Sequence, residues 1–302
     1  MDEDLTKSPP WLRKDSDDRP VNEVQQVWIE ASLKWFIEEF GREPLNRGIV
    51  LPGPDLFSGY TGTPRQIGRL VAAVCSLMQL TPSDLTLELF DLREEKDDPQ
   101  KRKGKRAVGH YYVQDGKPVI GLDVSEASDA SYLTAIIAHE LCHVRLLGEG
   151  RITRDRTDHE RLTDLLTVYY GFGIFNTNAA LRFGQDGRGF TVHPLGYLDE
   201  RALNTNRNDG YSRTGYLSEA EFSYAMACYA WLRRETEPEW TGHLDPGPRL
   251  CLKQGLAYLS RSAEPGELPT TRTDGVQVSV HVGSTGPIRG LYFPFPVFRP
   301  ST

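Results

Sequence analysis

One short segment, residues 134–144, holds side chains that could bind a metal ion and activate water. Within it, His139, Glu140 and His143 form the pattern His-Glu-x-x-His. Residues four apart lie on one face of an α-helix, so both imidazoles can reach the same ion. The carboxylate of Glu140 lies beside the first imidazole, where it can take a proton from a water molecule that the cation has acidified. This pattern is typical of a zinc hydrolase, with His139 and His143 as metal ligands and Glu140 as the catalytic base.

The residues around this pattern predict a buried helix. Apolar side chains recur at helical spacing through it: Leu133, Ile136, Ile137, Leu141, Val144 and Leu147. The alternative is a core helix whose two histidines only hydrogen-bond to their neighbours. Burying two imidazoles and a carboxylate on one apolar helix costs free energy unless they share a partner. A metal site is therefore the preferred interpretation.

Two histidines do not hold zinc well, so a third protein ligand is expected. Glu160 and Asp164 lie four residues apart in a second helical segment, which places them on one face of that helix. The stretch between His143 and Glu160 is long enough for a turn that brings the two helices together. Asp158 and Asp164 are the alternative third ligands.

The combined pattern resembles that of the gluzincin metallopeptidases, whose signature is His-Glu-x-x-His followed by Glu-x-x-x-Asp. The resemblance covers residues 107–180. It implies that Glu160 is the third zinc ligand and that Asp164 orients a ligand histidine through its second ring nitrogen. Small intracellular bacterial peptidases of the ImmA/IrrE type are the gluzincins most similar in the arrangement of elements. The metzincin family is set aside because Leu146 and Glu149 stand where its pattern requires Gly and His.

The elements that must position these residues predict an α+β fold. Asp115-Gly116 separates two alternating segments, 107–114 and 117–124, and is typical of a tight two-residue hairpin. Leucines alternate with polar residues over 85–89, which predicts another strand. The resemblance implies a zincin-like arrangement, in which the active-site helix packs under a short antiparallel sheet and other helices surround it. Such a sheet aligns an extended peptide along its edge strand.

Start and stop signals predict further helices. The predicted helices are residues 22–40, ended by Gly41; a helix with Thr63 as N-cap and Pro64 at its first position; residues 218–234, opened by Ser218 and Glu221 as a capping box; and residues 248–259. The small residues between Gly171 and Phe175 are expected to allow close helix packing.

Composition divides the chain into three parts. Residues 1–20 are charged and contain proline, and we expect a disordered N-terminus. Residues 21–262 form the predicted zincin-like metallopeptidase domain. Residues 263–302 form a tail rich in proline, glycine and threonine, with an aromatic segment at 291–298. We expect this tail to dock on its own domain, and it is also a candidate to bind a protein partner or to obstruct the active site.

Charge and cysteine usage limit the classes of protein. The formal net charge of −7 argues against a nucleic-acid partner. No apolar segment approaches the length of about 18 residues that a membrane span requires, and the acidic N-terminus is not typical of a secretory signal. The four cysteines are widely scattered: Cys75, Cys142, Cys228 and Cys251. They are expected to be reduced thiols of a cytoplasmic protein.

Together these patterns predict a zinc-dependent metallopeptidase that hydrolyses an intracellular protein or peptide. Two alternatives stay open. One is a regulatory or interaction protein that retains the fold with little turnover, and the other is a zinc hydrolase of a non-peptide bond. A gluzincin also requires a donor to the oxyanion that forms when water attacks a carbonyl. His193, Tyr211 and Tyr216 are candidates, and none has a spacing that distinguishes it.

Overall fold

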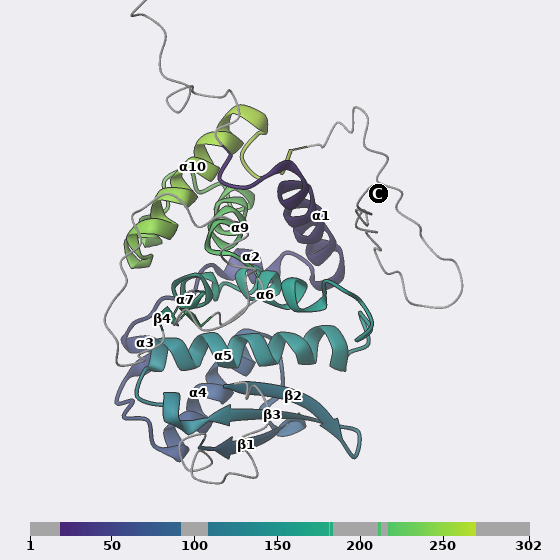
Figure 1. The fold of residues 1–302 in the computed structure, drawn as a ribbon, viewed down its shortest axis with the longest axis vertical. Coiled ribbons are helices and arrows are strands. Elements are labelled where there is room, and N and C mark those ends of the chain that lie inside the picture. Colours follow the sequence, from purple (N-terminus) through teal and green to yellow (C-terminus); the bar gives the residue numbers. More distant parts are fainter. Residues whose placement is uncertain (1–18, 92–107, 181, 184–210, 213–216, 270–302) are drawn as a thin grey trace, which may run out of the picture.

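The structure is a computed structural model that describes residues 19–91, 108–180, 182–183, 211–212 and 217–269 (Figure 1). Within these residues the fold is a mixed α+β arrangement, mostly helical with a small three-stranded sheet. This confirms the predicted α+β class. Nearly all of the predicted disordered N-terminus and most of the predicted tail, including its aromatic segment, lie outside the described residues. The division into three parts therefore stays a prediction.

The sheet contains three strands in the order β1-β3-β2. The strands are β1 (Thr86–Phe90), β2 (Gly109–Gln114) and β3 (Lys117–Asp123). Asp115 and Gly116 join β2 to β3, with φ values of 52° and 77°. Both lie in the left-handed region, as a two-residue hairpin turn of this kind requires. The predicted hairpin is confirmed, and β2 pairs antiparallel with β3.

The prediction of a purely antiparallel sheet is wrong for one strand. β1 pairs parallel with the other edge of β3, so the sheet is mixed. The alternating leucines of 85–89 predict a strand but not its direction. No tight turn joins β1 to β3, since β2 comes between them in the chain, and strands without such a turn can pair either way.

Helix α5 (Ala130–His143) lies between the sheet and a layer of helices (Figure 1). One side of α5 contacts β2 and β3, and the other side contacts α6 (His159–Tyr169) and α7 (Gly173–Ala179). α4 (Pro64–Leu77) also packs against α5. The helix continues into a π-helical turn over Val144–Gly148. The helix that carries the His-Glu-x-x-His pattern therefore packs on the sheet, as predicted.

The remaining long helices complete the layer beyond α6 and α7 (Figure 1). They are α1 (Glu23–Phe40), α9 (Glu219–Leu232) and α10 (Pro246–Ser262). Two short helices follow α1 in the chain, α2 (Glu43–Arg47) and α3 (Pro54–Phe57), and α3 contacts α4. A second, two-stranded antiparallel sheet joins β4 (Arg182–Phe183) to β5 (Tyr211–Ser212). Among the described residues, no helix combines the length and the apolar composition that crossing a bilayer requires.

The predicted helix ends are confirmed where local chemistry specifies them. Asn22, Thr63 and Ser218 each cap a helix through a reciprocal capping box, at the starts of α1, α4 and α9. In such a box the cap side chain and the third helical side chain satisfy backbone N–H groups that the helix itself leaves unpaired. Gly41 ends α1 with a φ of 72°, a conformation that glycine adopts without strain.

The glycines after α6 permit close packing, as predicted. Gly171 has a φ of 86°, and a Cβ atom there would lie 2.6 Å from the carbonyl oxygen of Gly48. A Cβ atom on Gly173 would overlap the sulfur of Met226 on α9. Each position therefore accommodates a hydrogen atom but not a methyl group. This close approach brings α6 and α7 against the rest of the helical layer.

The four cysteines are free thiols, and Cys75, Cys142 and Cys228 are buried. Burial raises the pKa of the Cys75 thiol to about 12 and also raises that of Cys142. These thiols are therefore protonated at neutral pH and poor nucleophiles. Cys142 lies inside the His-Glu-x-x-His pattern as a small buried residue of the core.

Candidate metal centre

Three side chains from two helices converge at one point. Oε2 of Glu160 lies 3.3 Å from Nε2 of His139 and 3.4 Å from Nε2 of His143. The potential ligand atoms of these three residues all lie within 4.8 Å of one another. Two imidazole nitrogens and one carboxylate oxygen form a donor set that binds divalent transition metals well. The three residues could therefore hold a metal ion.

His139 and His143 lie one turn apart on α5, so both side chains extend from the same face of the helix. That face is directed towards α6, where they contact Asp164 and Thr163. The side chains of His139 and His143 are 13 % and 9 % exposed, and that of Glu160 is 27 % exposed. The cluster is thus buried on the side of α5 and open to solvent on the side of Glu160.

Glu160, and not Asp158 or Asp164, reaches the two Nε2 atoms. Asp158 instead accepts hydrogen bonds from Nε of Arg156 at 2.5 Å and from Nε1 of Trp28 at 2.8 Å. Burial alone would raise the pKa of Asp158, but its bonds to Arg156 and Trp28 outweigh burial and lower it. Asp158 is therefore an ionised anchor at the start of α6. These bonds hold Asp158, the residue immediately before α6, in place. They thereby help to position Glu160 in the first turn of that helix.

Asp164 holds the first histidine. Its Oδ1 lies 2.9 Å from Nδ1 of His139, and its Oδ2 accepts the backbone N–H of Leu217 at 2.8 Å. A carboxylate only accepts hydrogen bonds, so Nδ1 of His139 donates to Asp164, and Nε2 is the nitrogen that faces the cluster. The structure thus gives Asp164 the contact with a ligand histidine that the resemblance implied.

Thr163 holds the second histidine in the same way. Its hydroxyl donates to the carbonyl of His159 at 2.8 Å, and its oxygen lies 3.3 Å from Nδ1 of His143. Because the hydroxyl proton is used, this oxygen accepts from Nδ1, and Nε2 of His143 is free for a metal. The sequence analysis missed Thr163. Its only signal was its position between Glu160 and Asp164 on α6.

Two further rings pack on this cluster, and the sequence analysis missed both. The ring of Tyr111 on β2 stacks on that of His143, with centroids 5.8 Å apart and an interplanar angle of 17°. Nε2 of His159 lies 3.1 Å from Oε1 of Glu160, while its Nδ1 donates to the carbonyl of Arg156 at 2.8 Å. His159 directly precedes Glu160 in the chain, and this adjacency was the only signal.

The protonation of these groups reflects burial and their mutual contacts. Burial raises the pKa of Glu140 to about 7, although the nearby charge of His139 opposes this. Burial would also raise the pKa of Glu160, but contacts with His139 and His143 outweigh it and hold the pKa well below its usual range. Glu160 is therefore an anion suited to a cation. Glu140 has the pKa expected of a group that exchanges protons near neutral pH.

The backbone of β2 at Gly109 lies in contact with the side chain of Glu140. A Cβ atom on Gly109 would lie 2.6 Å from Oε1 of Glu140 and 2.6 Å from Cγ2 of Ile136. Only glycine allows the strand this close to α5. The absence of a side chain at Gly109 therefore leaves the carboxylate of Glu140 next to the backbone of β2.

The outer edge of β2, near the cluster, pairs with no other strand among the described residues. The backbone N–H of Asp123 donates to the carbonyl of Val108 at 2.9 Å. In an antiparallel pair, hydrogen-bonded positions alternate along the strand, so Gly109 and Tyr111 turn their N–H and C=O groups away from β3. On this side Nη2 of Arg154 donates to the carbonyl oxygen of Tyr111 at 3.5 Å, so that carbonyl already has a partner. β2 thus presents an edge beside the metal cluster.

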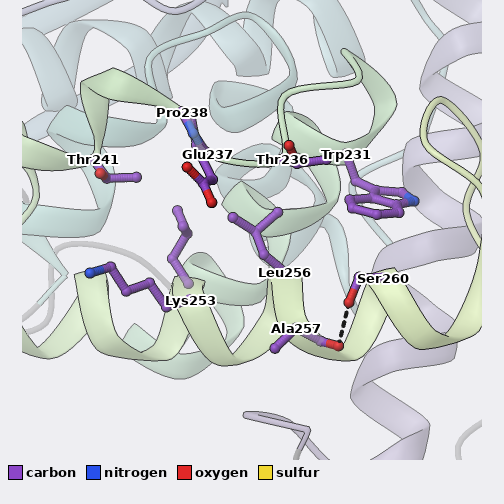
Figure 2. Close-up of a pocket in the computed structure, with 10 residues that line it drawn as sticks. Trp231, Thr236, Glu237, Pro238, Thr241, Lys253, Leu256, Ala257 and Ser260 are labelled. Atoms are coloured by element: carbon purple, nitrogen blue, oxygen red, sulfur yellow. Dashed lines mark hydrogen bonds between the residues drawn. The ribbon is translucent and has the colours of Figure 1, made fainter.

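A separate hollow of about 510 Å³ lies between α10 and the segment that follows α9 (Figure 2). Trp231, Leu252 and Leu256 supply apolar surface, while Glu237 and Lys253 face it with opposite charges. None of the residues of the metal cluster lines it. The hollow is therefore not part of the candidate metal centre.

The proposed oxyanion donors are not placed. His193 and Tyr216 lie outside the described residues, and Tyr211 is described only as backbone in β5. None of the three is therefore assigned a role.

No family model, curated protein or solved structure matches the chain. The geometry of the site must therefore support any functional statement on its own.

Proposed function

We propose that the chain is a zinc-dependent metallopeptidase of the gluzincin type. The observation that carries this proposal is the position of Oε2 of Glu160, 3.3 Å and 3.4 Å from the Nε2 atoms of two histidines that lie beside Glu140. Three protein ligands from nitrogen and oxygen are typical of catalytic zinc sites, whereas structural sites usually have four. The contact between Asp164 and His139 supports the same family, because it supplies the second half of the signature.

The residues around the cluster suit the hydrolysis of an amide. Zinc bound by His139, His143 and Glu160 would supply the Lewis acidity that makes water a nucleophile and polarises a carbonyl. Glu140 accepts a proton from the attacking water, and the new C–O bond forms on the carbonyl carbon. The C–N bond then breaks, and Glu140 passes the proton to the departing nitrogen. A carboxyl pKa of about 7 suits both transfers.

The free edge of β2 supports a polypeptide substrate. An extended chain can pair with the N–H and C=O groups of Gly109 and the N–H group of Tyr111, whose carbonyl accepts from Arg154, and so lie along the edge strand. Gly109 is in contact with Glu140 and Tyr111 is stacked on His143, so such a chain would pass the catalytic base and a metal ligand. Backbone pairing favours a peptide over a substrate with a non-peptide bond. Free buried thiols agree with a reducing, cytoplasmic compartment and hence an intracellular substrate.

The same edge supports one alternative function. A regulatory or interaction protein could bind a strand of a partner on β2 without hydrolysing it, because the pairing itself needs no chemistry. Glu140 distinguishes the two functions. It is 6 % exposed and is a base next to the metal cluster, a costly arrangement for a protein that only binds.

The test compares wild type with Glu140→Gln, using Glu23→Gln, at an exposed position of α1, as the control. Each protein is incubated with a bacterial proteome, and new N-termini are counted by mass spectrometry beside the zinc content of the protein. We expect equal zinc in all three proteins and a loss of cleavage of about 10²–10⁴-fold in Glu140→Gln alone. Equal fragments from wild type and Glu140→Gln would contradict a peptidase. Equal binding of partners with no fragments from any protein would favour the interaction protein.

A further inference from the structure

Arg154 lies on the outer edge of β2, beside the metal cluster. Its Nη2 donates to the carbonyl oxygen of Tyr111 at 3.5 Å, and its guanidinium carbon lies 5.7 Å from the centroid of the Tyr111 ring. The same ring stacks on the imidazole of His143. The guanidinium and a residue of the metal cluster are therefore in contact with one aromatic ring.

The charge of Arg154 has no acidic partner in the part of the chain that the structure describes, and its side chain is exposed. Arg156, two residues later, is by contrast paired with Asp158. A guanidinium keeps its charge throughout the physiological pH range and carries five N–H donors in a planar fork, which suits both oxygens of a carboxylate. The hydrogen bond to β2 uses one of these donors. The others are available to a ligand.

Arg154 also limits how far a substrate can pair with β2. Alternate residues of the strand, Gly109 and Tyr111 among them, turn their N–H and C=O groups away from β3. The carbonyl oxygen of Tyr111 already accepts from Arg154. An extended chain that pairs with Gly109 and with the N–H group of Tyr111 therefore meets the guanidinium where the next backbone hydrogen bond would form.

The position of Arg154 along β2 relates it to the bond that would be cleaved. Gly109 is in contact with Glu140, the proposed catalytic base. Tyr111 follows two residues later in the strand, and a strand advances about 3.3 Å per residue. A substrate group beside the carbonyl of Tyr111 therefore lies within about three residues of the cleaved bond.

We propose that Arg154 is a specificity-determining residue that binds a carboxylate of the substrate, within about three residues of the cleaved bond. This carboxylate belongs to an aspartate or glutamate side chain or to the C-terminus of the peptide, since both offer the same two oxygens. The inference rests on the proposed peptidase function and adds its substrate class. The formal net charge of the chain is −7, so a cation at this edge supplies a local attraction that the chain as a whole does not.

The first step of the test identifies the preferred sequence around the cleaved bond. The full-length wild type is incubated with peptides from a digested proteome, and mass spectrometry gives the residues on both sides of each cleaved bond. One cleaved peptide is then synthesised with glutamate or with glutamine at the preferred position. Each form is made with a C-terminal acid and with a C-terminal amide, which distinguishes the two sources of the carboxylate.

The second step compares variants on these peptides. Arg154→Gln removes the charge, Arg154→Lys keeps the charge without the fork, and Arg154→Glu reverses the charge. Arg261→Gln and Arg261→Glu make the same changes of charge at an exposed position of α10, on the far side of the helical layer from the sheet (Figure 1). Because both positions are exposed, the variants should keep the fold and the zinc content of wild type, which circular dichroism and elemental analysis check.

We expect wild type to cleave the peptide with the carboxylate with a kcat/KM about 10-fold higher than that for its amide counterpart. Arg154→Gln should abolish this preference through KM, with cleavage of the amide peptide within about twofold of wild type. Arg154→Lys should retain part of the preference, and Arg154→Glu should favour lysine or arginine at the same position. The Arg261 variants should match wild type.

Cleavage by wild type without an acidic preference near the cleaved bond would overturn the inference and leave the proposed function standing. The same holds for a preference that Arg154→Gln retains. An equal loss of cleavage of both peptides in Arg154→Gln would also overturn the inference, because Arg154 would then act only by packing on Tyr111. A zinc-loaded wild type that cleaves no peptide would overturn the proposed function, and the inference with it.

Discussion

Nδ1 of His139 donates to Oδ1 of Asp164 at 2.9 Å, and this contact decides which nitrogen of the imidazole faces Glu160. Burial alone would lower the pKa of His139, but the contacts with Asp164 and Glu160 outweigh it and raise the pKa. Asp164 is itself buried, and its contact fixes both the tautomer and the direction of the ring. A metal ion would therefore meet a ligand that is already oriented.

Asp164→Ala should lower zinc affinity by about 10–100-fold, since His139 would lose the partner that orients it. The expected measurement is competition with a chelator of known affinity. Asp155→Ala is the matched control, because Asp155 is exposed in the loop before α6. A zinc affinity unchanged in Asp164→Ala would show that the ring is oriented by other contacts.

Glu160→Ala should remove zinc as completely as His143→Ala does. Each change leaves two protein ligands, and two do not hold the ion. Elemental analysis of the purified proteins by plasma mass spectrometry measures the zinc content directly. Asp158→Asn serves as a comparison, since Asp158 binds Arg156 and Trp28 rather than the cluster and should leave zinc in place. Full zinc in Glu160→Ala would assign the third ligand elsewhere.

Gly109→Ala should impair catalysis more than metal binding. The added methyl group would meet Oε1 of Glu140 and Cγ2 of Ile136, each at 2.6 Å, so that the carboxylate or the strand must move. We expect unchanged zinc content, a stability loss of about 1–3 kcal/mol and reduced cleavage. Thermal unfolding and a cleavage assay measure the last two. Val113→Ala, at an exposed position of the same strand, should change none of the three.

Glu30→Gln should stabilise the protein at neutral pH and have less effect in acid. Burial raises the pKa of Glu30 above its usual 4.5, although bonds from Tyr224 and Gln26 oppose this, as do the charges of Lys34 and Arg19. The folded state therefore favours the protonated acid. Its contribution is complete below pH 4.5 and declines as pH rises through the raised pKa.

Glutamine imitates the protonated form at every pH, so its advantage over wild type should grow as pH rises above 4.5 and through the raised pKa. The measurement is the difference in melting temperature between the two proteins at each pH. Glu23→Gln, at an exposed position of the same helix, is the comparison and should show a smaller change with pH. A constant difference for Glu30→Gln would show that folding does not raise the pKa of Glu30.

Local signals predicted much of the fold and part of the site. The capping boxes at Asn22, Thr63 and Ser218 involve residues three apart, so the sequence contains both partners. The pairing of His139 with His143 is equally local, because it needs only a helix. The contact of Glu160 with these histidines also depends on a turn that packs α6 on α5. Only the family pattern indicated Glu160 as the third residue of the cluster.

Contacts between distant segments were not predictable in the same way. The parallel direction of β1 depends on how the chain crosses the sheet, which periodicity does not encode. Tyr111 reaches His143 only after the hairpin and α5 have packed together. His159 illustrates the limit from the other side. It lies next to Glu160 in the sequence, yet the position of its ring depends on the carbonyl of Arg156, whose side chain is bonded to the buried Asp158.

Asp164 has two oxygens, and the second accepts the backbone N–H of Leu217, the residue just before the cap of α9. One carboxylate thus joins a metal-site histidine to the start of a helix far along the chain. If metal binding stabilises the contact of Asp164 with His139, it also stabilises the contact of Asp164 with Leu217. The reverse effect has the same coupling free energy, because thermodynamic coupling is reciprocal. Occupancy of the metal site and order at the first turn of α9 are therefore linked. Hydrogen exchange at Leu217 should slow when metal binds, which would make this amide a reporter of the occupancy of the metal site.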